Sequence, residues 1–166
     1  MTANPEFRIK PAAERDVPLI LRMIKGLAEY EKRPREVVAD EAVLRKTLFG
    51  PRRYAEVLLG YVGKEPVAFA VFFHNYSTFL GRPGLYLEDL FVMPRWRRHG
   101  LGTRLLAHVA GLAVARGCRR FEWSALDWNE PAIRFYRALR ARQLHEWTGY
   151  RLTGKALAKL AGSAKN

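Results

Sequence analysis

The chain has 166 residues, of which 49% are hydrophobic and 12% aromatic, so it can bury a core and is too apolar to be disordered. Its formal net charge of +13 suits an anionic partner such as nucleic acid, anionic lipid or a phosphorylated cofactor. One cysteine excludes an internal disulfide, and no apolar run has the length of a signal-peptide core or a membrane span, so we expect a soluble, cytoplasmic protein without membrane contact.

The N-terminal part of the chain predicts one strand and two helices. A short alternation over residues 7–12 predicts the strand. Apolar residues at helical spacing over residues 14–31 predict a long helix, for which Asp16 is a candidate N-cap. After a polar break, residues 39–50 predict a shorter helix.

The central part predicts three consecutive strands. Two apolar runs, residues 54–63 and 65–77, flank the turn sequence GKEP, which indicates a hairpin. A third run follows at residues 84–93.

Helices and strands alternate in the remainder of the chain. We expect a helix over residues 100–117, a strand over 118–126, a helix over 129–140, a last strand over 144–152 and a short helix over 154–161. The complete order β-α-α-β-β-β-α-β-α-β predicts an α/β (α+β) fold with a mixed sheet covered by helices, and no linker interrupts it.

The junction between the third of these central strands and the next helix carries the sequence RRHGLG, residues 97–102. The first N–H groups of a helix have no internal partner, and glycines let the backbone approach a ligand closely. With Arg95, Arg97 and Arg98 these features predict an anion site suited to phosphate. Neither a P-loop nor a dinucleotide fingerprint fits the spacing, and a solvated glycine-rich turn is the remaining structural alternative.

The motif Arg97-x-x-Gly100-x-Gly102 resembles the acyl-CoA pyrophosphate loop of the GNAT N-acetyltransferases. Three further stretches, LAEYE (27–31), LYLEDLFVM (85–93) and WNEPAIRFY (128–136), resemble the spermidine/spermine (diamine) acetyltransferases and their thialysine-acetylating relatives. The resemblance covers nearly the whole chain. It implies a mainly antiparallel twisted sheet with helices on both faces, one domain over residues 1–166, acetyl-CoA as co-substrate, no metal, and a homodimer.

The resemblance also implies roles for particular residues. Acetyl-CoA would be held by three segments: Leu90, Phe91 and Val92; Arg97, Arg98, His99, Gly100, Leu101, Gly102 and Thr103; and Asn129, Glu130, Pro131, Ala132 and Tyr136. The amine substrate would lie near Tyr30, Glu31, Glu88, Asp89, Glu122, Trp123 and Ser124. The family's acidic substrate contact in the last strand is matched here by Thr148, with Glu146 close by, and this departure bears on polyamine specificity.

The chemistry of acetyl transfer to an amine supports two of these residues as catalytic. Glu88 and Asp89 are adjacent acids in an apolar strand, where buried charge is costly, and regular backbone would point them to opposite faces unless a bulge intervenes. We expect Glu88 to accept the ammonium proton through water, although an acid that caps the sheet, or one that pairs with an arginine beside the core, would also explain its presence there. Tyr136 is a candidate proton donor to the departing sulfur, although a core aromatic has the same helical spacing.

Two other functions fit the sequence. The acceptor could be a protein lysine or N-terminus, which an open groove in place of a narrow acidic pocket would favour. A basic nucleic-acid-binding module is suggested by the net charge alone, because no recognised nucleic-acid motif occurs. The four histidines show no metal-ligand spacing.

Overall fold

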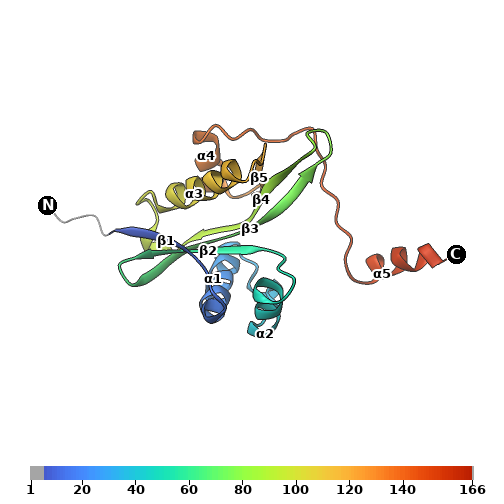
Figure 1. Ribbon diagram of the computed structural model, residues 1–166, viewed down its shortest axis with the longest axis horizontal. Helices are drawn as coiled ribbons and strands as arrows, with labels where there is room; N and C mark the ends of the chain where they lie inside the picture. Colours follow the sequence, from blue (N-terminus) through green and yellow to red (C-terminus); the bar gives the residue numbers. More distant parts are fainter. Residues whose placement is uncertain (1–5, 166) are drawn as a thin grey trace. The chain divides into compact units, whose positions relative to one another are not determined.

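The computed structural model describes residues 6–165, which fall into two compact units that divide after Ser124. The first unit contains a five-stranded sheet in the order β1-β2-β3-β4-β5 (Figure 1). The strands are β1 (Phe7–Pro11), β2 (Glu56–Val62), β3 (Glu65–Ser77), β4 (Arg82–Val92) and β5 (Phe121–Trp123). The first four strands pair antiparallel and β5 pairs parallel to β4, so the predicted mixed and mainly antiparallel sheet is confirmed.

Helices cover both faces of this sheet, as the pattern of elements predicts. On one face lie α1 (Val17–Tyr30) and α2 (Glu41–Leu44), the latter continued by a wider helical turn over Arg45–Phe49 (Figure 1). On the other face lies α3 (Leu101–Ala115), which packs against β3 and β4. We call these two sides the α1 face and the α3 face.

Alternation along β3 divides its side chains between the two faces. Phe69 and Val71 pack with α1 in one apolar core, where Phe69 meets Phe91 edge to face. Phe72 points the other way, and the guanidinium of Arg116 at the end of α3 lies 5.7 Å from its ring centre. The face of any paired residue of β4 can therefore be assigned from its partner in β3.

The start of α1 differs in one detail from the sequence prediction. Asp16 occupies the N-cap position but makes no capping bond to α1; its carboxylate accepts instead from the backbone N–H of Ala13. The bond closes the short turn Glu14–Asp16 that precedes the helix, and this local alternative is open to any aspartate in such a turn. Asp40 does cap α2, since its side chain accepts from Val43 N at 2.8 Å.

The register of β4 changes at Glu88. Asp89 pairs with Val71 whereas Leu87 pairs with Phe72, so Glu88 is an extra residue without a partner in β3. Such a β-bulge turns two consecutive side chains away from strict alternation. It resolves the difficulty that two adjacent acids in a strand would otherwise lie on opposite faces.

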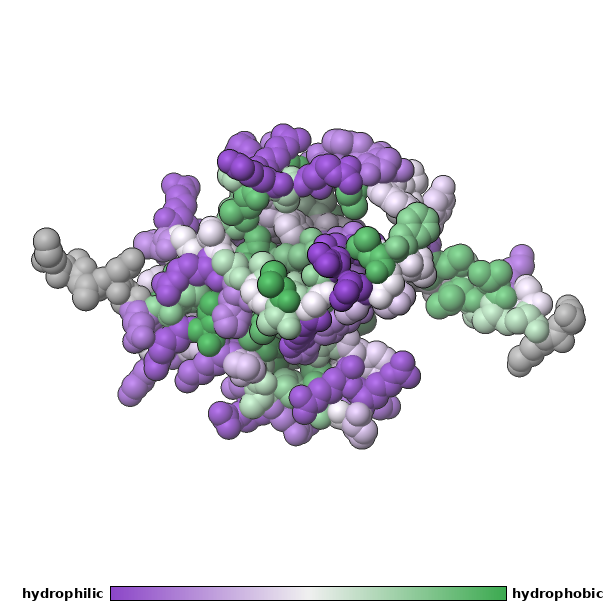
Figure 2. Space-filling model, turned by 45° about the horizontal axis from the view of Figure 1, so that its top comes forward, coloured by the Kyte–Doolittle hydropathy of each residue, from purple (hydrophilic) through white to green (hydrophobic). Residues whose placement is uncertain are grey.

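The second unit contains α4 (Glu130–Ala138) and α5 (Gly154–Gly162). The strand expected over residues 144–152 is not formed in the described chain, and this prediction is wrong for the isolated chain. Its apolar residues give the pattern of a strand, but a strand is stable only when its backbone groups pair with a neighbour, and none pairs with this segment. Trp147 and Tyr150 are consequently exposed, as are Leu157 and Leu160 of α5, a helix that Figure 2 shows largely in green. Within residues 6–165, no helix is both long enough and apolar enough to cross a membrane.

Candidate active site

Three carboxylates gather at the bulge on the α1 face, and we call Glu31, Glu88 and Asp89 the acidic cluster. Asp89 belongs to the α1 face because it pairs with Val71. Glu88 is exposed, and Glu31 follows directly after α1. The pKa of Asp89 is raised to about 6, mainly by burial and in addition by the negative charges of Glu88 and Glu31. The carboxyl group of Asp89 therefore changes charge within the range where many enzymes work.

Glu31 behaves in the same way to a smaller extent. Burial raises its pKa, while the nearby positive charge of Arg33 acts in the opposite direction. Two of three acids in the cluster thus hold their protons more firmly than free carboxylic acids do. A cation placed among them would restore their ionisation, which is the property of a site for an ammonium group.

Tyr30, the neighbour of Glu31, connects the end of α1 to the loop before α3. The guanidinium of Arg97 lies 4.3 Å from the ring centre of Tyr30, and its Nε donates to Val92 O at 3.0 Å. Arg97 also lies over the ring of Phe91. We expected Arg97 to bind phosphate, and the structure places its side chain between the aromatic rings and the backbone of β4.

The loop before α3 has the backbone of an anion site. Gly100 adopts φ 72° and Arg98 φ 63°, both in the left-handed region, which is strained for arginine. The first helical hydrogen bond runs from Arg104 N–H to Gly100 O. The N–H groups of the three preceding residues therefore have no partner within the helix, and nothing lies within 4 Å of the place where a Cβ of Gly100 would stand.

The three arginines of this loop have different surroundings. Arg95 pairs with Glu65, which also accepts from Trp96 Nε1 at 2.9 Å, and this arrangement anchors the loop to β3. His99 donates from Nδ1 to the carbonyl of Arg97 at 2.8 Å. Arg98 is exposed and makes no ion pair with the described residues, so it is the arginine of the loop whose charge is most available to an anion.

One edge of β4 is open beside this loop. β5 pairs with β4 only as far as Leu87 and Trp123, whereas β4 continues to Val92. The backbone of Leu90, Phe91 and Val92 therefore has no strand partner on that side within the described chain, although the ring of Phe91 is buried in the core. Val92 O on this stretch accepts from Arg97 Nε, and a strand edge without a strand partner can bind an extended polar chain.

The structure separates the expected substrate residues of β5. Glu122 pairs with Tyr86 and shares the α1 face, and Tyr86 OH lies 2.8 Å from Ser124 Oγ. Trp123 pairs with Leu87 and therefore lies on the α3 face, beside Phe121, because successive side chains of a strand alternate. Trp123 and Glu122 thus do not line one site on the α1 face.

Sequence reasoning missed two polar residues beside Glu122. Asn75 Nδ2 donates to Glu122 Oε2 at 2.8 Å, and Arg120 Nε lies 3.0 Å from the same oxygen. The one signal in the sequence was an asparagine inside the apolar run of β3. The contacts themselves could not be predicted, because they depend on which residues the strand registers bring opposite each other.

The remaining expected residues lie in the second unit. Asn129 caps α4 as predicted, since its Oδ1 accepts from Ala132 N at 3.4 Å, and Pro131 occupies the first turn. Glu130 pairs loosely with Arg134 at 3.9 Å. Tyr136 lies near the end of the same helix and its ring contacts Phe135. In the irregular segment that follows, Glu146 pairs with Arg142 at 3.0 Å.

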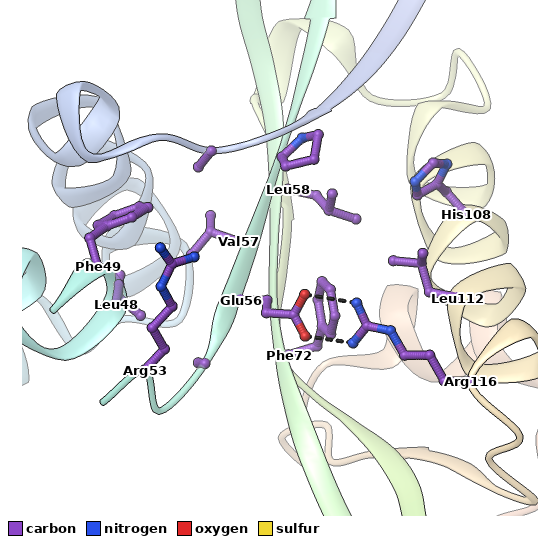
Figure 3. Close-up of a pocket in the computed structure, with 13 residues that line it drawn as sticks. Leu48, Phe49, Arg53, Glu56, Val57, Leu58, Phe72, His108, Leu112 and Arg116 are labelled. Atoms are coloured by element: carbon purple, nitrogen blue, oxygen red, sulfur yellow. Dashed lines mark hydrogen bonds and ion pairs between the residues drawn. The ribbon is translucent and has the colours of Figure 1, made fainter. Parts of the chain in front are cut away.

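A cavity of about 170 Å³ lies elsewhere in the first unit, where β1 ends and β2 continues (Figure 3). Apolar side chains such as Leu48 and Leu112 line it, and the two guanidinium nitrogens of Arg116 bind the carboxylate of Glu56 at 2.5 and 2.8 Å. None of the expected site residues borders it. The forked ion pair joins β2 to α3, which gives this region a structural role.

The excess positive charge collects in part around a second, open hollow of about 310 Å³ beside β1 and the β2–β3 turn. Its basic residues are Arg8, Lys10, Arg15 and Lys64, with Asp16 as the acid. This surface is what the nucleic-acid alternative would need, although it carries only one aromatic ring, that of Tyr61. In residues 6–165, no three His, Cys, Asp or Glu side chains are placed to hold a metal ion.

Comparisons with known proteins point to one family. The profile of the acetyltransferase (GNAT) family matches residues 23–140. The thialysine N-epsilon-acetyltransferase of Mus musculus is 37% identical over 166 residues, covering 93% of this chain and 97% of the mouse protein. The L-ornithine N5-acetyltransferase of Arabidopsis thaliana is 32% identical, covering 90% of this chain and 86% of the plant protein.

Solved structures agree with this fold. An integron cassette protein from V. cholerae superimposes with a TM-score of 0.79 at 25% identity, covering 93% of this chain and 97% of the cassette protein. An aminoglycoside acetyltransferase from an uncultured soil sample, in complex with sisomicin, gives a TM-score of 0.76 at 19% identity, covering 90% of this chain and 97% of that protein. The second likeness concerns the fold alone.

Proposed function

The chain belongs to the acetyltransferase (GNAT) family and is an N-acetyltransferase, and from that premise we propose that it transfers acetyl from acetyl-CoA to a primary amine of a small molecule. The acceptor is a thialysine-like amino acid or a diamine, and both substrates are bound together when the amine attacks. The observation that carries the proposal is the acidic cluster at the bulge of β4, on a strand that also has an open backbone edge and leads to a helix start whose first N–H groups have no partner within the helix.

The residues of the first unit fit acetyl-CoA at two places. The N–H groups at the start of α3 and the charge of Arg98 suit its diphosphate, and the open edge of β4 suits its extended pantetheine arm. Acetyl-CoA supplies an activated acyl group whose carbonyl carbon accepts the amine. Arg97 holds the loop in place through its contact with the ring of Tyr30 and its hydrogen bond to Val92 O.

The acidic cluster prepares the amine. Glu31 and Asp89 attract the ammonium form, and Glu88, which is exposed at the bulge, takes the proton through water so that the free amine can attack. The new C–N bond forms as the C–S bond breaks, and backbone N–H groups of β4 stabilise the charge that develops on the carbonyl oxygen. The departing thiolate takes up a proton, and the resemblance to the family implies the phenol of Tyr136 as its donor.

The test is thiol release by the purified protein with acetyl-CoA and a panel of amines: thialysine, ornithine, lysine, diamines, polyamines and lysine peptides. We expect release with small amines, and Glu88→Gln to lower kcat by about 10²-fold or more, the usual contribution of a general base. Glu29→Gln is the matched control, since Glu29 is an exposed carboxylate of α1 outside the cluster. Turnover with peptides alone would contradict the small-amine acceptor, and no turnover with any amine would contradict the whole proposal.

A further inference from the structure

A cation and an anion lie side by side on the α1 face, one strand away from the acidic cluster. Arg120 Nε is 3.0 Å from Glu122 Oε2, and Arg120 Nη2 donates to Tyr76 O at 3.1 Å. Asn75 Nδ2 donates a hydrogen bond to the same carboxylate oxygen at 2.8 Å. We call Asn75, Arg120 and Glu122 the polar triad.

The fold makes room for this triad. Gly84 of β4 pairs with Asn75, and a Cβ at that position would stand 2.3 Å from Asn75 Oδ1 and 2.9 Å from Arg120 Cγ. A side chain at Gly84 would therefore displace the triad. Asn75 Oδ1 is buried without a hydrogen-bond partner among the described residues, which is uncommon for a polar atom, and the buried Arg120 Nε contacts Glu122 Oε2 as an ion pair without forming a hydrogen bond of good geometry.

Both charged groups keep unused bonding capacity. The side chains of Arg120 and Glu122 remain 36% and 28% exposed. Arg120 Nη1 and Glu122 Oε1 have no bonding partner within residues 6–165. The triad thus offers one donor for an anion and one acceptor for a cation, beside each other and reachable from solvent.

The triad lies at a defined distance from the acidic cluster. Asp89 and Tyr86 are same-face neighbours along β4, opposite Val71 and Phe73, and Glu122 pairs with Tyr86 on the next strand. Strand geometry then places the Cα atoms of Asp89 and Glu122 about 8 Å apart. The rings of Phe73 and Tyr86, 5.3 Å apart, form an aromatic floor between them.

We propose that the polar triad binds the α-amino and α-carboxylate groups of an amino acid whose side-chain amine is acetylated at the acidic cluster, an inference that rests on the proposed function. The side-chain nitrogen of thialysine is five bonds from its α-carbon, which corresponds to about 6 Å of extended chain. The methylene and thioether atoms lie on the aromatic floor. The α-carboxylate of the substrate accepts a hydrogen bond from Arg120 Nη1, and its α-ammonium group donates one to Glu122 Oε1.

This assignment separates amino acids from diamines. A diamine of the same length presents an ammonium group to Glu122 but has no carboxylate to place beside Arg120. The positive charge of Arg120 then repels the ammonium group of the diamine. Arg120 is therefore a specificity-determining residue that favours the carboxylate, whereas Glu122 serves either class. Because neither residue touches the reacting nitrogen, both act on substrate affinity more than on kcat.

The experiment compares each amino acid with its decarboxylated partner: thialysine with its diamine analogue, and ornithine with putrescine. We expect Arg120→Gln to raise KM for the amino acids by about tenfold or more, the loss typical of a charge-assisted hydrogen bond, and to leave KM for the diamines unchanged or lower. Glu122→Gln should raise KM for both classes. Arg119→Gln removes the same charge from an exposed neighbouring position and should change neither.

Calorimetry with thialysine and its diamine analogue makes the inference testable apart from catalysis. We expect wild-type protein to bind thialysine more tightly, and Arg120→Gln to remove that preference while circular dichroism and melting temperature stay those of the wild type. If Arg120→Gln weakens both ligands equally, or neither, the inference is wrong although acetyl transfer stands. If the preference is found but no amine is acetylated, the inference stands and the proposed function fails.

Discussion

At the scale of single residues, the protonation state of Asp89 is the property of the acidic cluster that can be tested directly. Its pKa is raised to about 6, mainly by burial and further by Glu88 and Glu31, so it loses its negative charge when the pH falls through that value. We expect kcat/KM for the amine to fall on the acid side with a midpoint near 6, because the protonated cluster attracts an ammonium less. In Asp89→Asn this limb should disappear and kcat/KM at neutral pH should fall by about tenfold.

The measurement is the pH dependence of kcat/KM at saturating acetyl-CoA. Glu29→Gln should keep the wild-type profile, since its carboxylate lies outside the cluster. An unchanged midpoint in Asp89→Asn would assign the titration to another group and remove Asp89 from the amine site.

The start of α3 is the element whose geometry most directly bears on coenzyme binding. Arg98→Gln removes the charge that no described residue neutralises, and we expect KM for acetyl-CoA to rise by about tenfold with kcat little changed. Arg95→Gln is the matched control and should have a smaller effect, because Arg95 already pairs with Glu65. Steady-state kinetics with varied acetyl-CoA check this, and equal effects of the two variants would contradict it.

The connection between β2 and α3 gives a prediction about stability. The hydrogen bond from Arg116 holds the pKa of Glu56 below its ordinary value, with the positive charge of Arg116 acting in the same direction. The stabilisation is therefore present above the ordinary pKa of a glutamate and is lost as the pH falls through the lowered one. Because the Glu56 side chain is 45% exposed, we expect Glu56→Gln to lower the free energy of unfolding by only about 1 kcal/mol or less at pH 7.

Urea unfolding at pH 7 and again in acid tests this prediction. The difference between wild type and Glu56→Gln should shrink in acid, where Glu56 is protonated in the wild type. A difference that persists unchanged would mean that packing in the cavity of Figure 3, and not the ion pair, is responsible.

The elements differ in how far the sequence predicts them. The helical spacing of α1 and α3 and the apolar runs of β2, β3 and β4 are local patterns, and the sheet and its covering helices follow from them. The strand expected over residues 144–152 has an equally good pattern, but whether it forms depends on a partner that no local pattern specifies. The polar triad also escapes prediction, since Asn75 and Glu122 are 47 residues apart and meet only through the registers of three strands.

On the scale of the whole molecule, the charge of +13 opposes the approach of a cationic substrate while the acidic cluster attracts it locally. Raising the ionic strength from about 0.01 to 0.15 M shortens the screening length from about 30 to about 8 Å, which weakens the distant repulsion more than the close attraction. We therefore expect kcat/KM for a doubly charged diamine to rise with salt at saturating acetyl-CoA, and more than for thialysine, whose net charge is smaller. A fall for both would mean that local attraction governs association.

The shift of register at Glu88 has a consequence for how this chain tolerates change. Substituting an acid there alters chemistry, but removing Tyr86 and closing the bulge would place Glu88 opposite Phe72 and turn its side chain to the α3 face. Strand length is thus under the same constraint as side-chain identity. An enzyme shortened in this way would lose the carboxylate of Glu88 from the amine's path although every acid were retained.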